Sequence, residues 1–417
     1  MYDRQTVIVL GGTNPHKELI ERLKKKGYYT VLVDYLDNPP AKAAADEHVQ
    51  ESTLDKELVV KIAKDKNAVL VISTCVDHAN VIAAYASEKL GLPRPYSYDS
   101  ARKIADKTMM KEIMVENGIP TARHESFDER TEIPSMSFRF PVVVKPADTG
   151  GSKGVRVAEN PEELEAFSKD ALDISQSKKG IVEEYLEGME FQAYFFIHNR
   201  RPHLGVIMEK HRIFSDNRLM MQAFMASIPA EISKDAKKKI QEIAEKLTEI
   251  FKLNNTALFI QGILNQDEVQ VIEFAPRIGG GLSYRLIEMA TGMKILDHSI
   301  DGLLSSEISI QAQSPQEHFA ICNLYSTEGI YSHIEGFEEL IKDGLIEEYY
   351  HYRSPGDQIS QELVSRNRVA AFITKGKNKE TLIHHVIQSV ERIRIYLEDG
   401  RESHRREIYT YLKEGIK

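Results

Sequence analysis

The first hundred residues alternate short β-branched runs with helical segments, and this rhythm constrains the fold more than any other feature. TVIVLGG precedes a helical pattern from Glu18 to Lys26, and YTVLVDY and AVLVIST follow as further strands. Strands that are separated by helices in this way pair in parallel, with helices covering the sheet. The sequence therefore predicts an α/β fold class.

A parallel layer of this kind often binds a dinucleotide, and Asp34 ends the second strand about where a ribose-binding acid would lie. However, the turn after the first strand reads GGTNPH and not G-x-G-x-x-G. Pro15 also removes an amide donor from the turn that would hold a pyrophosphate. The sequence thus favours a Rossmann-like layer that helps to build a substrate pocket over an NAD-dependent oxidoreductase.

Length, charge and cysteine content exclude several other classes. A chain of 417 residues is too long for one ordinary core, so two to four domains are expected. The formal charge of −9 offers no footprint for nucleic acid or an anionic membrane. Cys75 and Cys322 lack metal-ligand spacing and are expected to be reduced core residues. The sequence shows neither a signal-peptide pattern nor a long apolar run, so we expect the protein in a reducing cytoplasm.

Three further helices are expected along the chain. The first runs from about Ser100 to Glu116, after the proline-rich boundary GLPRPYSYDS. The second is amphipathic and covers Asp235 to Leu253, and the third runs from Lys379 to Glu398. HFAICNLYS and RVAAFITKG are predicted strands in the C-terminal part.

The stretch FPVVVKPADTGGSKGVRVA places a glycine-rich segment between two strands. It is not a P-loop, because that motif leads into a helix. Gly150, Gly151 and Gly154 permit positive φ and allow backbone amides to approach an anion. Ser152 adds a hydroxyl donor, and Lys145 adds a positive charge at the strand end. A plain hairpin tip explains the glycines equally well, so this segment alone leaves both interpretations open.

A downstream hairpin brings two oxygen ligands together. TALFIQGILNQDEVQVIEFAP reads as two strands with a polar turn, and a turn centred on Asp267 places Gln261 opposite Glu273. Side chains opposed in this way have Cβ atoms about 5 Å apart. The pair suits a hard cation such as Mg²⁺ that is shared with phosphates. The alternative, a solvated polar face, does not explain the apolar residues on both flanks.

In order and spacing, these motifs resemble the ATP-grasp enzymes, in the branch that includes carbamoyl-phosphate synthetase large subunits, purine-pathway enzymes, biotin carboxylase and bacterial L-amino acid ligases. The resemblance spans nearly the whole chain. It implies a Rossmann-like N-terminal domain over residues 1–97, an ATP-grasp core over 98–313 and an α+β C-terminal domain over 314–417. A two-strand glycine lid is implied within a subdomain over about 126–190.

By this resemblance, two lysines and the glycine lid hold the nucleotide phosphates. Lys107 in ADKTMMK matches the first phosphate-binding lysine, and Lys145 in VVVKP matches the second. TGGSKG matches the lid, with Ser152 and Gly154 nearest the phosphates. Two lysines and several backbone amides can offset the roughly four negative charges of ATP.

The segment EEYLEGME resembles the adenine and ribose site. Glu183 is expected to face the exocyclic amine of adenine, and the backbone at Glu184 and Leu186 to read the ring edge. Glu190 corresponds to the acid that binds the ribose hydroxyls. Without the resemblance, each of these glutamates reads as an exposed charge on a strand.

The metal site departs from the family pattern, in which the second acid heads E-x-N-x-R and the arginine contacts the phosphate chain. Glu273 and Arg277 match that pattern, but Ala275 replaces the asparagine and has no side-chain ligand to offer. The resemblance implies ATP with one or two Mg²⁺ ions, or Mn²⁺ in their place. A second ion would be held by Glu273, Gln261, water and phosphate alone. A one-metal arrangement is the alternative.

After the hairpin, RIGGGLSYRLIEM resembles the loop and arginine that face the substrate. Arg285 is the candidate for binding a substrate carboxylate bidentately, and a structural salt bridge is the alternative. His298 is placed two turns deeper in the same helix and is expected to be a packing residue. Lys210 and Arg212 are interpreted as members of a solvated charge cluster.

The implied function is an ATP-dependent carboxylate–amine ligase. A substrate carboxylate attacks the γ-phosphate to give an acyl phosphate and ADP, and an amine then displaces phosphate to form an amide. The expected partners are a small carboxylate and an amine, and a homodimer fits the resembled family. The alternatives are a bicarbonate-activating enzyme and, because of Ala275, an ATP-binding module without catalysis.

Overall fold

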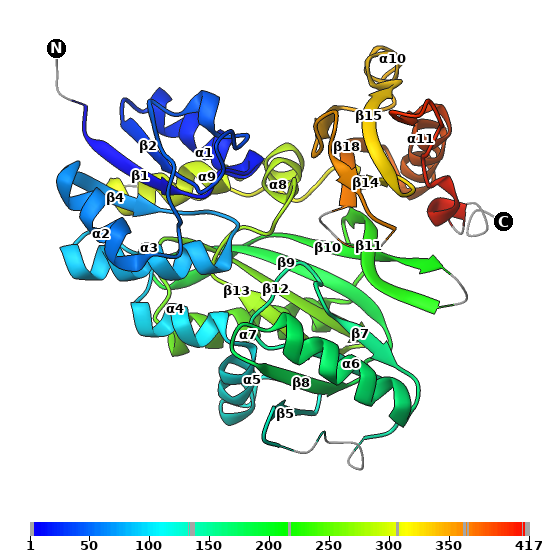
Figure 1. Cartoon of the computed structure of the whole chain (residues 1–417), viewed down its shortest axis with the longest axis horizontal. Coiled ribbons are helices and arrows are strands. Elements are labelled where there is room, and N and C mark those ends of the chain that lie inside the picture. Colours follow the sequence, from blue (N-terminus) through cyan, green and yellow to red (C-terminus); the bar gives the residue numbers. More distant parts are fainter. Residues whose placement is uncertain are drawn as a thin grey trace.

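In the computed structural model, the described part of the chain contains four β-sheets (Figure 1). None of the helices within the described part of the chain is long and apolar enough to cross a membrane. The structure describes residues 4–131, 133, 138–215, 218–305, 308–361, 364, 367–410 and 412.

The N-terminal domain is the predicted parallel sheet with helices on both faces. Its four strands are ordered β3-β2-β1-β4, and every pair is parallel. The β-branched runs fill its core, and Val7, Ile8 and Val31 are fully buried. The elements are β1 (Thr6–Leu10), α1 (Asn14–Lys25), β2 (Tyr29–Val33), β3 (Glu47–Val49), α2 (Lys56–Asp65), β4 (Ala68–Ile72) and α3 (Asp77–Leu90).

Helix α1 begins one turn earlier than the helical pattern predicts. It starts at Asn14, with Pro15 in its first turn, where the fixed φ of proline favours the helix and its missing amide is not needed. Because the first turn is polar, the periodicity of apolar residues does not reveal where this helix begins. The same proline argues against a pyrophosphate cradle at this turn.

The single helix predicted from Ser100 to Glu116 is wrong, because the structure has two. Helix α4 (Tyr98–Ala105) ends before Asp106, whose backbone is extended and whose carboxylate accepts from the amides of Thr108 at 2.9 Å and Met109 at 3.2 Å. Asp106 therefore acts as the N-cap of helix α5 (Lys107–Glu116). The break makes Lys107 the first residue of α5.

The glycine-rich segment belongs to a small antiparallel sheet ordered β5-β8-β6-β7. As predicted, it connects two paired strands, β6 and β7. Helix α6 packs on this sheet and closes a separate small core. The elements are β5 (His124–Asp128), β6 (Val142–Pro146), β7 (Arg156–Ala158), α6 (Pro161–Ile174) and β8 (Lys179–Glu184).

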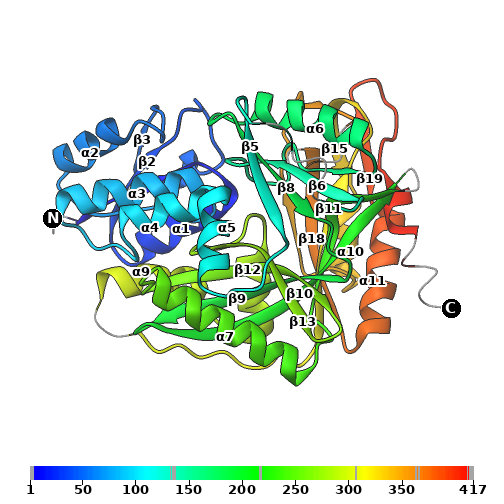
Figure 2. The same ribbon diagram turned by 90° about the horizontal axis from the view of Figure 1, so that it is seen from below.

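An antiparallel sheet of eight strands, ordered β13-β12-β9-β10-β11-β14-β18-β16, forms the centre of the molecule. Alternate residues of β9 face opposite sides of this sheet: Phe195 shares a core with residues of α7, and Phe196 shares a core with residues of α8, α9 and the N-terminal domain. Figure 2 shows α7 lying against β9 and β10. The elements up to residue 304 are β9 (Met189–His198), β10 (Arg201–Ser215), β11 (Arg218–Ile228), α7 (Lys234–Ile250), β12 (Thr256–Asn265), β13 (Glu268–Ala275), α8 (Ser283–Thr291) and α9 (Ile295–Leu304).

The C-terminal part contributes three strands to this central sheet and adds a small sheet ordered β17-β15-β19. The central sheet thus runs across the domain limit predicted at 313/314. The helix predicted to reach Glu398 is wrong beyond Arg392, because the last residues pair with β15 as a strand. The elements are β14 (His318–Tyr325), β15 (Gly329–Glu335), α10 (Phe337–Lys342), β16 (Glu348–His351), β17 (Gln358–Ile359), β18 (Arg368–Gly376), α11 (Lys379–Arg392) and β19 (Arg394–Leu397).

Candidate active site

Two adjoining cavities lie where the small sheet, the central sheet and the N-terminal domain meet. The first, here called the narrow pocket, is lined by β6, the glycine-rich loop, residues 183–186 and the β12–β13 hairpin. The second, the wide cleft, has a volume of about 540 Å³ and extends to the N-terminal domain and to β14 and β18. A common wall separates them, formed by Lys107, Thr149, Gly150, Gly151, Ser152, Gln261 and Glu273.

Two lysines share one buried carboxylate beside the narrow pocket. The β6–β8 pairing places Glu183 opposite Val143, with Lys145 two residues further along β6. Lys145 Nζ lies 2.6 Å from Glu183 Oε1, and Lys111 Nζ lies 3.2 Å from the same atom. Two ammonium groups on one carboxylate leave a net positive charge. Lys145 lines the pocket and Lys111 does not, so Lys145 presents this charge to an anion.

Titration of this cluster reflects its burial and its charges. Burial alone raises the pKa of Glu183, but the charges of Lys111 and Lys145 more than offset burial and lower it to about 2. Burial lowers the pKa of Lys111 to about 8, against the attraction of Glu183. The carboxylate is therefore ionised throughout the physiological range.

Glu183→Gln is expected to lower the unfolding free energy at neutral pH by about 3–5 kcal/mol, because it leaves two buried cations without their carboxylate. The native pKa is depressed from 4.5 to about 2, so the stability from Glu183 is complete above about pH 4.5 and is lost as the pH falls toward 2. The variant should therefore also lose less stability over that range. Urea unfolding at neutral pH and at about pH 3.5 measures both effects. Glu165→Gln, at an exposed glutamate of α6, is the control, and equal stability of both variants at neutral pH would contradict the expectation.

A second buried cluster surrounds Glu190 on β9. Its carboxylate contacts Lys210 Nζ at 2.5 Å and Arg212 Nε, and its Oε1 accepts from Gln261 Nε2 at 2.7 Å. Burial alone raises the pKa of Glu190, but Lys210 and Arg212 more than offset it and lower it. The interpretation of Lys210 and Arg212 as solvated charges is wrong. The β9–β10 register sets Lys210 directly opposite Glu190, a pairing that strand alignment of the sequence could have found.

The predicted pairing of Gln261 with Glu273 is present in the β12–β13 register. It arises differently, because the turn is Gln266-Asp267, and an irregularity between Gln261 and Gly262 restores the register. The amide oxygen of Gln261 accepts from Gln192 Nε2 at 3.0 Å. Sequence reasoning did not single out Gln192.

The carboxylate of Glu273 lies on the common wall, and no hydrogen bond or ion pair engages it among the described residues. The structure's described ranges also hold no cluster of three or more His, Cys, Asp or Glu side chains able to bind a metal by themselves. One unpaired carboxylate next to an amide oxygen fits a cation that takes its other ligands from water and phosphate. Ala275 is buried opposite Phe259 and supplies no ligand.

The glycine-rich loop contributes residues 149–152 to the common wall. Lys107 Nζ donates to the carbonyl of Thr149, and the amide of Lys107 donates to the carbonyl of Ala147 at 3.0 Å. Ser152 lines both cavities with a φ of 62°, a rare conformation for a residue other than glycine. Gly154, predicted to lie near an anion, does not line either cavity and packs at the base of the loop.

Gly154→Ala is expected to destabilise this loop by about 1–3 kcal/mol. Its φ is 74°, and a Cβ atom there would lie 2.8 Å from Pro146 Cγ and 2.9 Å from Ile174 Cδ1. Gly150→Ala is the matched control, since a Cβ atom there would meet only Asp77 Oδ2, at 3.9 Å. Thermal unfolding measures the difference between the two variants. Equal melting temperatures would show that the base of the loop adapts to a methyl group.

Residues 184–186, at the end of β8 and just beyond it, line the narrow pocket. Glu184 closes the strand, and its amide donates to the carbonyl of Arg123 at 2.9 Å. Tyr185 and Leu186 follow outside the strand and reach the same pocket. The expected adenine and ribose residues, Glu183, Glu184, Leu186 and Glu190, are thus brought to one cavity together with Lys107, Lys145 and Ser152.

Arg277 joins the N-terminal domain to the core at the wide cleft. Its Nε and one terminal nitrogen each lie 2.5 Å from a carboxylate oxygen of Asp77, the first residue of α3, and its guanidinium lies 5.0 Å from the ring centre of Phe259. Asp77 was not anticipated, although an acid at the start of a helix was a signal for it. The proposed contact of Arg277 with a phosphate chain stays a prediction.

Arg285 does not line either cavity. It contacts Glu348 on β16 through two nitrogens, with Nε at 3.1 Å from Oε2. This arrangement is the salt bridge that the sequence left open as the alternative. His298 lies in α9 and not in the helix of Arg285, because Gly292 ends α8 in a left-handed conformation. As expected for a packing residue, His298 lies against Phe196, with ring centres 5.4 Å apart.

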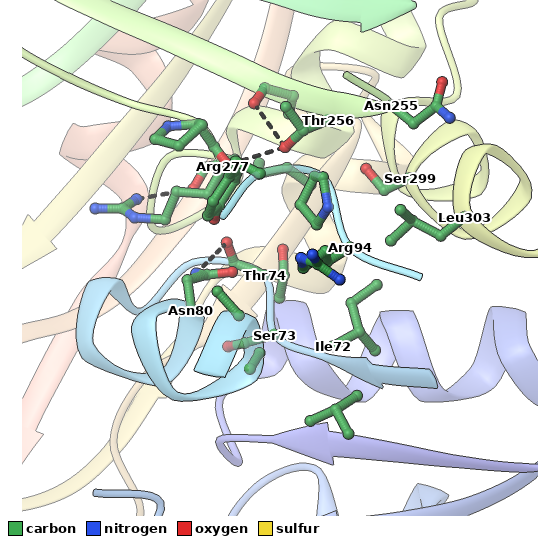
Figure 3. A pocket seen from close by; sticks show the side chains of 18 of the residues that line it. Ile72, Ser73, Thr74, Asn80, Arg94, Asn255, Thr256, Arg277, Ser299 and Leu303 are labelled. Carbon is green, nitrogen blue, oxygen red and sulfur yellow. Dashed lines mark hydrogen bonds between the residues drawn. The ribbon is translucent and has the colours of Figure 1, made fainter. Parts of the chain in front are cut away.

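A third, much smaller cavity lies behind Arg277, between the N-terminal domain and the core (Figure 3). Its volume is about 50 Å³, enough for a few water molecules. Asn80 donates to the carbonyl of Thr74 at 3.4 Å, while the hydroxyls of Thr74 and Ser87 are buried without a hydrogen-bond partner among the described residues.

Comparison with known proteins finds an ATP-grasp domain within the chain. Residues 138–285 match the ATP-grasp domain. The chain is 28% identical over 246 residues to a phosphoribosylamine–glycine ligase of Lactococcus lactis, covering 55% of this chain and 58% of that protein. It is 26% identical over 302 residues to a D-alanine–D-alanine ligase of Aquifex aeolicus, covering 70% of this chain and 96% of that protein. Residues 138–285 are therefore an ATP-grasp domain, as the resemblance predicted.

Solved structures show the same fold. An L-amino acid ligase from Bacillus licheniformis superimposes with a TM-score of 0.80 at 17% identity, covering 95% of this chain and 100% of that one. A phosphoribosylglycinamide synthetase from Anaerococcus prevotii gives 0.73 at 21% identity, with the same coverage. These structures confirm the predicted ATP-grasp fold. The chain spans little more than half the length of the Lactococcus relative.

Proposed function

We propose that the protein is an ATP-dependent carboxylate–amine ligase that forms an amide through an acyl phosphate. The observation that carries this proposal is the common wall. It places the unpaired carboxylate of Glu273 and the amine of Lys107 between a pocket with excess positive charge and a wide cleft with room for two small substrates. The relatives named as ligases support the same class.

The narrow pocket would hold ATP. Lys145, with the excess charge of its cluster, and Lys107 would neutralise the phosphates, and the glycine loop would cover them. Residues 184–186 would contact the base, and Glu190 would accept hydrogen bonds from the ribose hydroxyls. Lys210 and Arg212 keep Glu190 ionised and fixed for this role.

Glu273 would hold Mg²⁺, with Gln261 beside it, and the bound ion would supply neutralising charge to the phosphates. A second ion would depend on water and phosphate for its remaining ligands, because Ala275 lies buried against Phe259. The donor set therefore favours weak binding of a second ion or a single-ion arrangement.

The reaction needs positioning more than acid–base groups. A substrate carboxylate in the wide cleft would attack the γ-phosphorus across the common wall, forming a carboxyl oxygen–phosphorus bond while ADP leaves. An amine from the cleft would then attack the acyl carbon, releasing phosphate and one proton. The glycine loop would exclude the water that would otherwise hydrolyse the acyl phosphate.

ADP release from Mg·ATP by the purified protein tests this function. Amino acids are supplied singly and in pairs, and bicarbonate forms a separate arm. Stimulation by an acid together with an amine, with an amide as product, supports the ligase. Stimulation by bicarbonate alone would replace it by a carboxylating activity. ATP binding without turnover in any arm would favour a nucleotide-binding module, the alternative that Ala275 motivates.

A further inference from the structure

Arg368 is a cation of the wide cleft that none of the roles above uses. It is the first residue of β18 and lines the cleft with Ile321 and Asn323 of β14 and with Gln222 of β11. It lines neither the narrow pocket nor the common wall. A ligand at Arg368 is therefore separate from the nucleotide.

The guanidinium of Arg368 has no carboxylate partner within 4.0 Å among the residues that the structure describes. The other arginine that lines the cleft, Arg277, is neutralised by Asp77. An arginine that is partly withdrawn from water is normally paired with an opposite charge, because desolvating an unpaired charge is costly. Where such an arginine faces a cleft, its missing partner is expected to be a ligand.

The guanidinium of Arg368, which lines the cleft, is held at one of its three nitrogens. Its Nε donates to the hydroxyl of Tyr325 at 3.2 Å, and this hydroxyl donates to the carbonyl of Ala223 at 3.4 Å. Because Nε is already used, the two terminal nitrogens remain for a ligand. Two such N–H groups on one planar fork match the two oxygens of a carboxylate.

We propose that Arg368 binds a carboxylate of the substrate that is not the one activated by ATP. The assignment of a non-reacting carboxylate rests on the proposed function, because the activated carboxylate must reach the common wall. Charge favours a single carboxylate over a phosphate group. Arg368 supplies one uncompensated positive charge, whereas Lys210 and Arg277 on the same cleft are already paired. The side-chain amide of Asn323 offers a neutral donor beside it.

Matched ligands and variants test this assignment. The ligands are free amino acids and short mono- and dicarboxylic acids, each compared with its carboxamide, in the presence of Mg·ATP. The variants are Arg368→Gln, which removes the charge, and Arg368→Lys, which keeps the charge and removes the fork. Arg392→Gln, at an exposed arginine of α11 that pairs with Asp343, is the control for charge loss. The readouts are the ligand-induced shift in melting temperature and the KM in ADP release.

We expect at least one free acid to raise the melting temperature of the native protein and of Arg392→Gln, whereas its carboxamide does not. Arg368→Gln should bind that acid about 10- to 100-fold more weakly and lose the distinction between acid and amide. Arg368→Lys should fall between. Without ligand, Arg368→Gln should melt close to the native protein, since the hydrogen bond to Tyr325 is lost but no ion pair is. A lower melting temperature would indicate a structural arginine.

The proposal is overturned if no acid of the panel shifts the melting temperature, or if acid and amide remain distinguished in Arg368→Gln. Failure of the ligase function gives a different result. In that case ADP release is not stimulated by any acid and amine, while the acid-dependent shift in melting temperature persists in the native protein and is lost in Arg368→Gln.

Discussion

Glu273→Gln is expected to reduce ADP formation on the order of 10³-fold while leaving the melting temperature nearly unchanged, because a metal ion supplies several kcal/mol of charge stabilisation. The carboxylate of Glu273 has no partner among the described residues, so its loss removes no contact from the fold. Its place on the common wall would put it beside both the phosphates and the second substrate of the proposed reaction. Steady-state ADP release over a range of Mg²⁺ concentrations, together with thermal unfolding, measures the two effects.

Glu268→Gln is the matched control for this variant. Glu268 lies on the same strand, but it is exposed and contacts Lys239 at 3.3 Å. The control should keep native turnover and native metal dependence. Unchanged turnover in Glu273→Gln would remove the proposed metal ligand. A large fall in its melting temperature would instead assign Glu273 to the fold.

Lys145→Met is expected to lower kcat/KM for ATP by about 10²–10³-fold, the usual cost of removing one preorganised charge at a transferring group. Lys145 is 4% exposed and carries the excess charge of the cluster into the narrow pocket. In the variant, Lys111 and Glu183 remain as a neutral pair at 3.2 Å. Stability should therefore change far less than in Glu183→Gln. ADP release at varied ATP concentration, with urea unfolding of both variants, tests this contrast.

Lys179→Met controls for the loss of a lysine from the same sheet. Lys179 is the exposed first residue of β8. It does not line the narrow pocket, so this variant should keep the native dependence on ATP. If Lys145→Met and Lys179→Met behave alike in ADP release, the charge of the Lys145 cluster does not act on the nucleotide. If Lys145→Met is as unstable as Glu183→Gln, the cluster serves the fold more than the site.

The nucleotide side of the site could be predicted from sequence because its residues lie in short local motifs. The glycine loop, the residues after β8 and the hairpin each bring their functional side chains within a few positions of one another. The pairing of Gln261 with Glu273 follows from the alternation of side chains along the two strands. The turn differs from the predicted one, but the irregularity after Gln261 preserves the pairing. Whether these residues act as expected stays a prediction for the experiments above.

Charge pairing over long sequence distances could not be predicted. Arg277 meets Asp77, 200 residues away, and Arg285 meets Glu348, 63 residues away. The sequence pointed to Arg285 as the carboxylate-binding arginine and did not single out Arg368. Only the assembled structure shows that Glu348 neutralises Arg285, whereas no carboxylate of the described residues neutralises Arg368.

By itself, the sequence determined the α/β class, the order of the elements and the local motifs of the nucleotide pocket, because patterns of period two and 3.6 and glycine positions act over short stretches. The tertiary structure decided which charges are satisfied. Asp106 split the predicted helix and made Lys107 the first residue of α5. The β9–β10 register set Lys210 opposite Glu190. The C-terminal strands brought Arg368 to the cleft. Charges interact through space, so their partners are fixed only once the sheets are assembled.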